Sequence, residues 1–377
     1  MNNLYDFIVV GAGVSGCTFA SSINKRFPQA SILIVEIGRR IGGRSTTRKS
    51  RKNLILEFDH GLPSINLSNS ISNDLLSFIS PLLKSKRLID ISNDILHINE
   101  YGFLSKQDID QKTFRCLPFM INFSKEIINQ SKNPEKIHFL FETLINSFIR
   151  KNDLWEVKIN YERYLRAKNL ILSSSLLAHP RCLKILNMDS IPLREAFKLG
   201  TDNIVDGVIE KIVKQEYIKR KNYILFVPYS KILEKINFKN LQICFSEAIK
   251  NKFSYERLIF QRQIDGSLVI VLHCFYYNKH FDVSFESIIQ SLKIIFVKHK
   301  LFLDLFLHAQ LIDEMDWRAS QPLNNFLPTQ LQWSSVSKIG FCGDWFEMGD
   351  CDRVEAAMNS AIRLSKMLTQ NDFKIAC

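Results

Sequence analysis

The first part of the chain carries two apolar runs that predict buried strands. Residues 5–10 (YDFIVV) end in such a run, and residues 31–36 (SILIVE) contain a second. Continuous apolar runs of this length are typical of parallel strands that are buried on both faces. Between them, a glycine turn at 11–16 leads into a helix predicted over 17–27, with small residues on the side that approaches the sheet. The pattern therefore predicts a β-α-β unit.

The pattern farther along the chain predicts more sheet and helix. Residues 136–175 alternate between apolar and polar positions like a meander of strands and end in a buried strand at 168–174. Pro118 marks the start of a helix predicted over 118–131, and residues 352–368 predict a final amphipathic helix. The middle third, about 180–320, predicts a separate antiparallel sheet with covering helices, one of them a core-facing helix over 293–311.

Composition places the chain among folded proteins of enzyme size. Its 377 residues, 46% of them hydrophobic, suffice for a large core and allow two domains. The net charge of +12 comes from scattered lysines and arginines, and no basic run is interleaved with aromatic residues as a nucleic-acid groove requires. The longest basic cluster, at 48–52, is expected in an exposed hairpin or loop. The sequence therefore predicts no nucleic-acid partner.

Neither the N-terminus nor the cysteines indicate an extracellular protein. The strand at 5–10 leads directly into the glycine turn, without the charged and apolar regions of a signal peptide. The eight cysteines form no Cys-x-x-Cys pair and no ligand spacing with histidine, so we expect free thiols in a reducing compartment and no metal site. No stretch reaches the roughly 20 apolar residues of a membrane-spanning helix. We therefore expect a cytoplasmic protein without a membrane span.

The glycine turn carries the first candidate chemistry. In GAGVSG, Gly11 permits the tight turn out of the strand, Gly13 lets the backbone approach a pyrophosphate, and Gly16 allows close contact between helix and strand. The helix N-terminus offers free N–H groups and a positive dipole to the phosphate. Glu36 ends the second strand at the distance where a carboxylate accepts hydrogen bonds from ribose hydroxyls. The alternatives are a packing turn for the glycines and a solvated strand end for Glu36.

A second glycine pair follows closely. In GRRIGGRSTT (38–47), Gly42 and Gly43 precede Arg44, whose planar fork suits bidentate binding of phosphate oxygens. We expect this segment to bring a flexible backbone and a guanidinium to the same pyrophosphate. A plain NAD-binding domain does not ordinarily need such a second clamp. An ordinary surface turn is the alternative.

A third motif, GFCGDWFEMGDCDRVEAAMNSAIRLSKML, occupies residues 340–368. Together with GAGVSG and with Glu36 and GRRIGGRSTT, it resembles the FAD-dependent amine oxidase superfamily, and within it the renalase-like branch. The resemblance also takes in DHGLPSI (59–65), RCLPFMINFSKEI (115–127) and WRASQP (317–322), whereas the middle third contributes little. The chain length favours this branch over the longer carotenoid desaturases and monoamine oxidases.

The resemblance implies noncovalent FAD and residues that bind it. It places Asp344 on the hydroxyl-rich ribityl chain and the Arg353-Val354 backbone near flavin O2. The alternatives are a plain β-turn at Asp344 and a solvated first helical turn at Arg353. The final helix would direct its N-terminus at the flavin edge where negative charge develops on reduction. Trp317 and Arg318 are candidates for lining the substrate cavity, against core and surface roles. The predicted cofactor-binding residues are Gly11, Ala12, Gly13, Ser15, Gly16, Glu36, Gly42, Gly43, Arg44, Gly61, Gly343, Asp344, Arg353 and Val354.

The sequence departs from the family pattern toward the substrate. Pro63 and Ser64 stand where the family usually offers glutamine and an aromatic residue near the flavin, and Ala319 stands where it often carries an aromatic residue. Cys351 matches no flavin-attachment motif, so we expect an ordinary thiol. No motif of nucleophile and base stands out, and the isolated histidines, including His273, are expected in structural or surface roles. The sequence therefore identifies no catalytic residue.

These observations predict an α/β protein in which a Rossmann-like FAD-binding domain is interleaved with an α+β substrate domain built on an antiparallel sheet. The first domain is predicted from residues 1–70, 115–180 and 323–377, and the second from 71–114 and 181–322. In the predicted reaction, flavin N5 accepts a hydride from a reduced nitrogen-containing small molecule, by resemblance an abnormal dihydro isomer of NAD(P), and oxygen reoxidises the flavin to give hydrogen peroxide. An amine oxidase, a polyene desaturase and a non-catalytic flavin-binding protein are the alternatives. The sequence predicts no oligomeric state.

Overall fold

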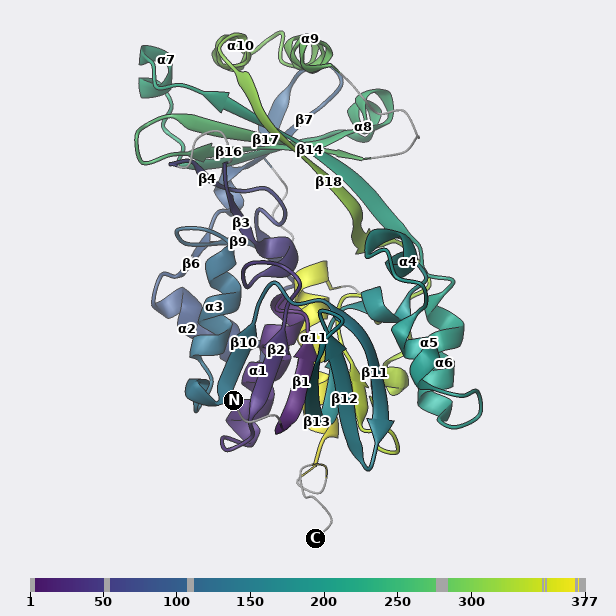
Figure 1. Cartoon of the computed structure of the whole chain (residues 1–377). Coiled ribbons are helices and arrows are strands. Elements are labelled where there is room, and N and C mark those ends of the chain that lie inside the picture. The colour runs from purple at the N-terminus through teal and green to yellow at the C-terminus, as the bar shows by residue number, and fades with distance from the viewer. Residues whose placement is uncertain are drawn as a thin grey trace.

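Two large sheets organise the chain (Figure 1). The computed structural model describes residues 4–50, 55–106, 112–275 and 284–372, except 348, 350, 370 and 371. One sheet lies at the lower end of the view among helices, and the other lies above it, with α9 and α10 on its outer side. The long strands β14 and β18 run from the upper sheet toward the lower one. Among these residues, no helix has the length and apolar character that crossing a bilayer demands.

The first sheet contains the predicted β-α-β unit. Its order is β10-β2-β1-β13-β12-β11, and β20 and β19 continue beside β13. The strands β10, β2, β1, β13 and β20 are parallel to one another, whereas β11 and β12 form an antiparallel meander with the start of β13 and β19 is antiparallel to β20. The strands are β1 (Leu4–Val10), β2 (Ile32–Val35), β10 (Ile137–Leu140), β11 (Ile145–Lys151), β12 (Leu154–Ile159), β13 (Arg163–Leu172), β19 (Trp333–Ser334) and β20 (Ile339–Phe341).

Helices cover both faces of this sheet, which explains its unbroken apolar strands. In β1, Phe7 and Val9 pack into one core and Ile8 into another, and all three are fully buried. The first core includes residues of α1 (Val14–Arg26), α2 (Asn73–Lys84), α3 (Ile121–Asn129) and α11 (Arg353–Met367). The second includes residues of α5 (Pro192–Ala196) and α6 (Asn203–Ile212), beside α4 (Arg181–Ile185).

The second sheet has the order β18-β14-β17-β16-β15-β7-β8 and is antiparallel except where β7 and β15 pair. One of its faces packs under α9 (Phe285–Ile295) and α10 (Lys300–Leu307), while the other has a small apolar cluster around Phe58 and turns toward the first sheet. The strands are β7 (Ile95–Ile98), β8 (Leu104–Lys106), β14 (Tyr217–Val227), β15 (Asn240–Phe245), β16 (Tyr255–Arg262), β17 (Leu268–Phe275) and β18 (Gln310–Pro322), with short helices α7 (Lys231–Glu234) and α8 (Glu247–Phe253).

Two small sheets are formed by strands within residues 47–116. β3 (Thr47–Lys49) pairs with β4 (Glu57–Asp59), and β5 (Ile65–Leu67) and β6 (Leu88–Asp90) flank β9 (Lys112–Cys116). The predicted basic hairpin at 48–52 begins in β3, and its residues 51–52 lie outside the described residues.

The predicted fold class is confirmed, and several element boundaries shift. The helix predicted at 17–27 begins earlier, at Val14, and the one predicted over 118–131 is shorter, because α3 begins three residues after Pro118. The helix predicted over 293–311 is wrong. The backbone turns at Phe296, whose carbonyl accepts a hydrogen bond from the His299 N–H, and α10 ends at Leu307 before β18 begins. No glycine or proline marks that turn, and the apolar pattern continues on both sides of it, so the sequence predicted one helix where there are two.

Candidate functional site

The predicted site residues converge on one cavity of about 830 Å³ between the two large sheets. All the predicted cofactor-binding residues line it except Ala12 and Gly16, and both substrate candidates, Trp317 and Arg318, line it as well. Its walls come from the carboxyl ends of β1, β2 and β13, the start of α11, and strands β14, β16, β17 and β18. The volume is in the upper part of the roughly 300–1,000 Å³ range of ligand pockets. Ligands of open α/β sheets bind at these strand ends.

The glycines of the first loop have different physical roles. Gly11 has φ +102°, a conformation that disfavours other residues, and a Cβ on Gly16 would lie 2.1 Å from the Gly11 carbonyl oxygen. Gly16 therefore permits the close contact of helix and strand that the sequence predicted. A Cβ on Gly13 would meet no atom within 4 Å, so packing does not require glycine at this position. The missing side chain leaves open space on the cavity side.

The N-terminus of α1 opens into the cavity without a protein partner for its dipole. Gly13 is its N-cap, no side chain of the described residues caps it, and its first turn contains no acidic residue. Uncapped N–H groups and the positive end of the helix dipole together favour an anion. The N-terminus of α11 differs, because the Asp352 carboxylate accepts a hydrogen bond from the Arg353 N–H at 2.7 Å.

The second glycine pair packs directly against the first loop. The Gly42 N–H donates to the Ala12 carbonyl at 2.8 Å, and a Cβ on Gly43 would lie 3.1 Å from the Gly13 Cα. Both glycines of the pair have positive φ, +114° and +54°. The two turns predicted from separate motifs thus form one continuous wall.

Glu36 holds the glycine loop from the end of β2. One carboxylate oxygen accepts a hydrogen bond from the Ala12 N–H at 2.8 Å, and the other accepts one from the Gly38 N–H at 2.7 Å. The side chain is half-buried and lines the cavity, so it is not merely a solvated strand end. The remaining lone pairs of the carboxylate are the ones that a ribose would use.

Arg44 and Asp344, predicted to bind different parts of the cofactor, bind each other. Two parallel hydrogen bonds of 2.7 Å join the guanidinium to the carboxylate, and Arg44 also donates to the Ser320 carbonyl at 2.8 Å. Asp344 is buried, whereas the Arg44 side chain keeps 47% of its accessible surface, within the cavity. Burial opposes the Arg44 charge, but Asp344 raises the pKa of Arg44 above its ordinary value. The pair links β18 to the turn after β20.

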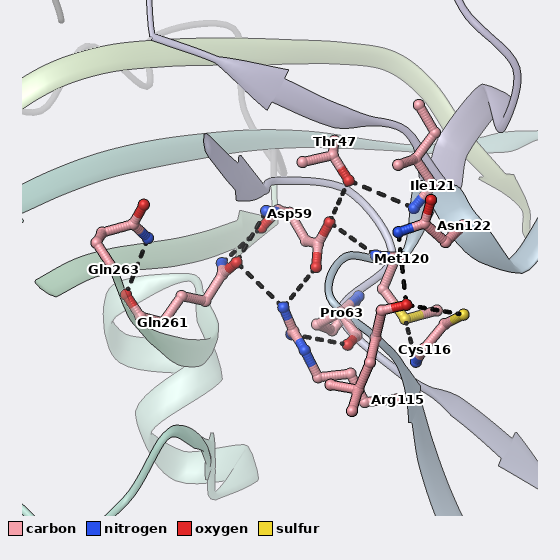
Figure 2. Close-up of polar contacts among 11 residues, drawn as sticks. Thr47, Asp59, Pro63, Arg115, Cys116, Met120, Ile121, Asn122, Gln261 and Gln263 are labelled. Atoms are coloured by element: carbon pink, nitrogen blue, oxygen red, sulfur yellow. Dashed lines mark hydrogen bonds and ion pairs between the residues drawn. The ribbon is translucent and has the colours of Figure 1, made fainter. Parts of the chain in front are cut away.

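A buried network of residues outside the cavity lining joins three of the motifs behind the resemblance (Figure 2). The Asp59 carboxylate accepts hydrogen bonds from the Thr47 hydroxyl at 2.6 Å, the Met120 N–H at 3.1 Å and the Arg115 guanidinium at 2.6 Å. Gln261 of β16 exchanges two 2.8 Å hydrogen bonds with the Asp59 backbone. Asp59 and Arg115 are only 1% and 2% exposed. The network therefore fixes the segment after Asp59 against the second sheet.

That segment meets the substrate candidates at the cavity wall. A Cβ on Gly61 would lie 2.2 Å from the Arg44 carbonyl oxygen and 3.2 Å from the Trp317 ring, so only glycine fits there. Trp317 stacks on His60 with ring centroids 5.5 Å apart, while Arg318 is exposed. The three residues that depart from the family pattern, Pro63, Ser64 and Ala319, all line the cavity.

Several lining residues escaped the sequence prediction. Some lie on strands of the second sheet, and there only His273 is a single polar residue within an apolar run, LVIVLHCF, which is a signal that the sequence offered. His273, expected in a structural or surface role, is buried and lines the cavity. The others include Ser173, Ser174, Ser175, Arg181, Tyr217, Arg220, Asn222, Glu256 and Arg257.

Sequence comparison supports the dinucleotide-binding prediction at the N-terminus. The NAD(P)-binding Rossmann-like domain family matches residues 9–81. An uncharacterized protein of Methanocaldococcus jannaschii is 26% identical over 255 residues, which cover 61% of this chain and 66% of that protein's length.

Solved structures extend the similarity to nearly the whole chain. Putrescine oxidase bound to putrescine has a TM-score of 0.61 at 11% identity, covering 97% of this chain and 98% of that one. An oxidoreductase from Methanosarcina mazei has a TM-score of 0.59 at 10% identity, covering 96% and 99%. A fatty acid isomerase from P. acnes that produces CLA has a TM-score of 0.60 at 8% identity, covering 97% and 99%. These identities are low, and the conclusion they carry is that the chain has the fold of these enzymes.

Proposed function

We propose that the protein is an FAD-dependent oxidoreductase of the amine oxidase superfamily and its renalase-like branch. The observation that carries this proposal is the convergence of residues predicted from distant motifs, at 11–16, 36–44, 61, 343–344 and 353–354, on one cavity. The Rossmann-like match at 9–81 and the fold shared with known oxidoreductases support a dinucleotide cofactor.

Three features of the cavity support FAD binding. The uncapped start of α1 and the open space beside Gly13 suit a pyrophosphate, and the adjoining Gly42-Gly43 turn completes that wall. Glu36 would hold the adenosine ribose, and Asp344 with Arg44 would meet the ribityl and phosphate groups. When bound, FAD supplies the hydride acceptor. We propose noncovalent binding.

The chain's own residues would orient the donor against the flavin and keep water away from it. The donor would lie beside the polar residues by which the second sheet lines the cavity, close to Trp317. We propose a reduced nitrogen-containing small molecule, with an abnormal dihydro isomer of NAD(P) as the specific candidate and oxygen as the acceptor that yields hydrogen peroxide. The charged residues Arg220, Glu256 and Arg257 in this wall disfavour an apolar polyene.

The proposed domain division follows the two sheets. The first sheet would bind FAD, and the second would bind the substrate. Although α2 and α6 lie within the stretches predicted for the substrate domain (71–114 and 181–322), their buried residues join the cores of the first sheet, so we place both helices with it. The thiols of Cys17, Cys116, Cys182, Cys244, Cys274 and Cys342 are free, in keeping with the cytoplasmic location that we propose. Cys377 lies outside the described residues.

Anaerobic mixing separates the enzyme hypotheses. The purified protein is mixed, without oxygen, with dihydronicotinamide isomers, simple amines and a carotenoid precursor while the flavin absorbance is followed. We expect bleaching with a dihydronicotinamide isomer and peroxide formation when oxygen is admitted. Bleaching by an amine or by the carotenoid precursor alone would identify the corresponding alternative. No bleaching with any donor would favour a non-catalytic flavin-binding protein.

A further inference from the structure

The cavity wall formed by the second sheet carries two cations that share one anion. Arg220 donates to the two Glu256 carboxylate oxygens at 2.7 and 3.0 Å, and Arg257 donates to the same carboxylate at 3.0 Å. Glu256 is buried, and the side chains of Arg220 and Arg257 are only 11% and 29% exposed. All three line the cavity. The cluster therefore presents an excess positive charge at a largely buried surface.

A β-bulge brings Glu256 and its neighbour Arg257 to the same wall. In a regular strand, successive side chains point to opposite faces. The register of β16 against β17 shifts between Tyr255 and Arg257. Tyr255 and Leu258 pack into the core under α9 and α10, whereas the two charged residues between them line the cavity. Bulges of this kind re-aim side chains beside active sites.

Buried donors around the cluster lack acceptors. Arg257 and Trp317 line the cavity, and their buried nitrogens Nε and Nε1 have no hydrogen-bond partner among the described residues. Burial lowers the pKa of His273, the cross-strand neighbour of Arg257, to about 3, so this imidazole is neutral at neutral pH. Burial would raise the pKa of Glu256, but Arg257 and Arg220 hold it well below its ordinary value. The excess of one positive charge therefore persists at neutral pH.

Other charges of the lining do not cancel this excess. Asp344 is paired with Arg44. Asp316 and Arg318 are exposed residues of opposite charge on β18. At the start of α11, Asp352 caps the helix and is followed directly by Arg353. Glu36 lies at the far end, on the glycine loop.

We propose that Arg220 and Arg257 bind an anionic group of the substrate, a carboxylate or a phosphate. The inference rests on the proposed function, because the substrate concerned is the donor that faces FAD, but anion binding itself needs no turnover. Arg220 donates from all three guanidinium nitrogens, to Glu256 and to Ser320 Oγ at 2.7 Å, and Arg257 donates to Glu256 from Nη2. Each guanidinium carries five N–H groups, and those that remain can donate charge-assisted hydrogen bonds to a carboxylate or a phosphate. A donor whose only charge is positive, such as a diamine, would instead add a cation beside the excess positive charge, which is unfavourable.

Calorimetric titration of the purified protein with four small aromatic probes tests this proposal. Benzoate carries a carboxylate, phenyl phosphate a phosphate, benzyl alcohol no charge and benzylamine a positive charge. We expect at least one anion to bind, and to bind on the order of tenfold or more tighter than either other probe. The tighter of the two anions identifies the anionic group. Equal binding of benzyl alcohol or benzylamine, or no binding of either anion, would overturn the proposal.

Three variants assign the anion to the cluster. Arg257→Gln is expected to weaken binding of the anion on the order of tenfold, whereas Glu256→Gln is expected to tighten it severalfold by removing the competing carboxylate. Arg163→Gln, at an exposed position on β13, is the matched control and should change nothing. A folding defect would weaken binding in both cluster variants, whereas the proposal predicts opposite changes. Weaker binding by a Glu256→Gln protein that unfolds in urea like the wild type would contradict the proposal. FAD is measured by visible absorbance in the same samples. A protein that contains no FAD would refute the proposed function, and the calorimetry would still test the anion site.

Discussion

Replacing Gly13 by alanine adds one methyl group that should weaken FAD binding and leave the stability of the protein nearly unchanged. Gly13 has φ −75°, which any residue adopts, and its Cβ would meet no atom within 4 Å. At a helix N-cap, alanine lowers the stability of the folded protein by about 1 kcal/mol relative to glycine. Alanine also reduces the conformational entropy of the unfolded chain, which raises stability by about 0.4–1 kcal/mol. We therefore expect the stability of the FAD-free protein to change by less than about 1 kcal/mol.

The same methyl group would stand where the pyrophosphate approaches the start of α1. Losing one charge-assisted hydrogen bond to a backbone N–H costs about 1.5–3 kcal/mol, which corresponds to a dissociation constant for FAD raised roughly 10- to 100-fold. Gly16→Ala is the matched comparison. Its Cβ would lie 2.1 Å from the Gly11 oxygen and 2.7 Å from Ser173 Oγ, so we expect overpacking that costs about 1–3 kcal/mol of stability.

Two titrations measure both quantities. Urea unfolding of the FAD-free protein gives the free energy of unfolding, and quenching of FAD fluorescence gives the dissociation constant. We expect Gly13→Ala to alter the second and not the first, and Gly16→Ala to alter the first. Unchanged FAD affinity in a folded Gly13→Ala protein would refute the assignment of this loop to the pyrophosphate.

Further substitutions test other parts of the account. Glu36→Gln leaves one of two backbone N–H groups facing an amide donor, and we expect FAD to bind on the order of tenfold more weakly; unchanged affinity would contradict a role in ribose binding. Arg115→Met leaves Asp59 buried without its cation and should cost about 3–5 kcal/mol in urea unfolding, part of which Asp59→Asn should restore in the same background; strictly additive losses would contradict the coupling. Burial lowers the pKa of His60 to about 4 and that of His273 to about 3, so unfolding binds protons below the ordinary value of 6.5 and stability falls as the pH is lowered. From pH 7 to pH 5 each imidazole should cost about 2 kcal/mol, and His273→Gln should remove about half of that loss; an undiminished loss would refute its share.

The first β-α-β unit was predictable because its signals are local. The apolar strands are buried on both faces. In GAGVSG, Gly11 has a positive φ, Gly16 packs against the Gly11 carbonyl, and Gly13 leaves open space beside the cavity. Glu36 and Gly42-Gly43 were within reach of the same reasoning, since both pack on that loop. Motif spacing therefore identified the residues of this cavity wall.

The opposite wall was not predictable from spacing. Arg220 and Glu256 lie on different strands, and the bulge at Glu256 reverses the alternation that would assign its face. The pairing of Arg44 with Asp344 likewise joins residues 300 positions apart. The first contact depends on the strand order of the second sheet, and the second depends on how distant parts of the chain meet beside the first sheet. No local pattern encodes either.

The absorbance spectrum of the purified protein tests the central claim most directly. The account predicts the visible bands of a flavin, and release of FAD into solution when the protein is denatured by heat. A colourless protein that cannot be reconstituted with FAD would contradict it.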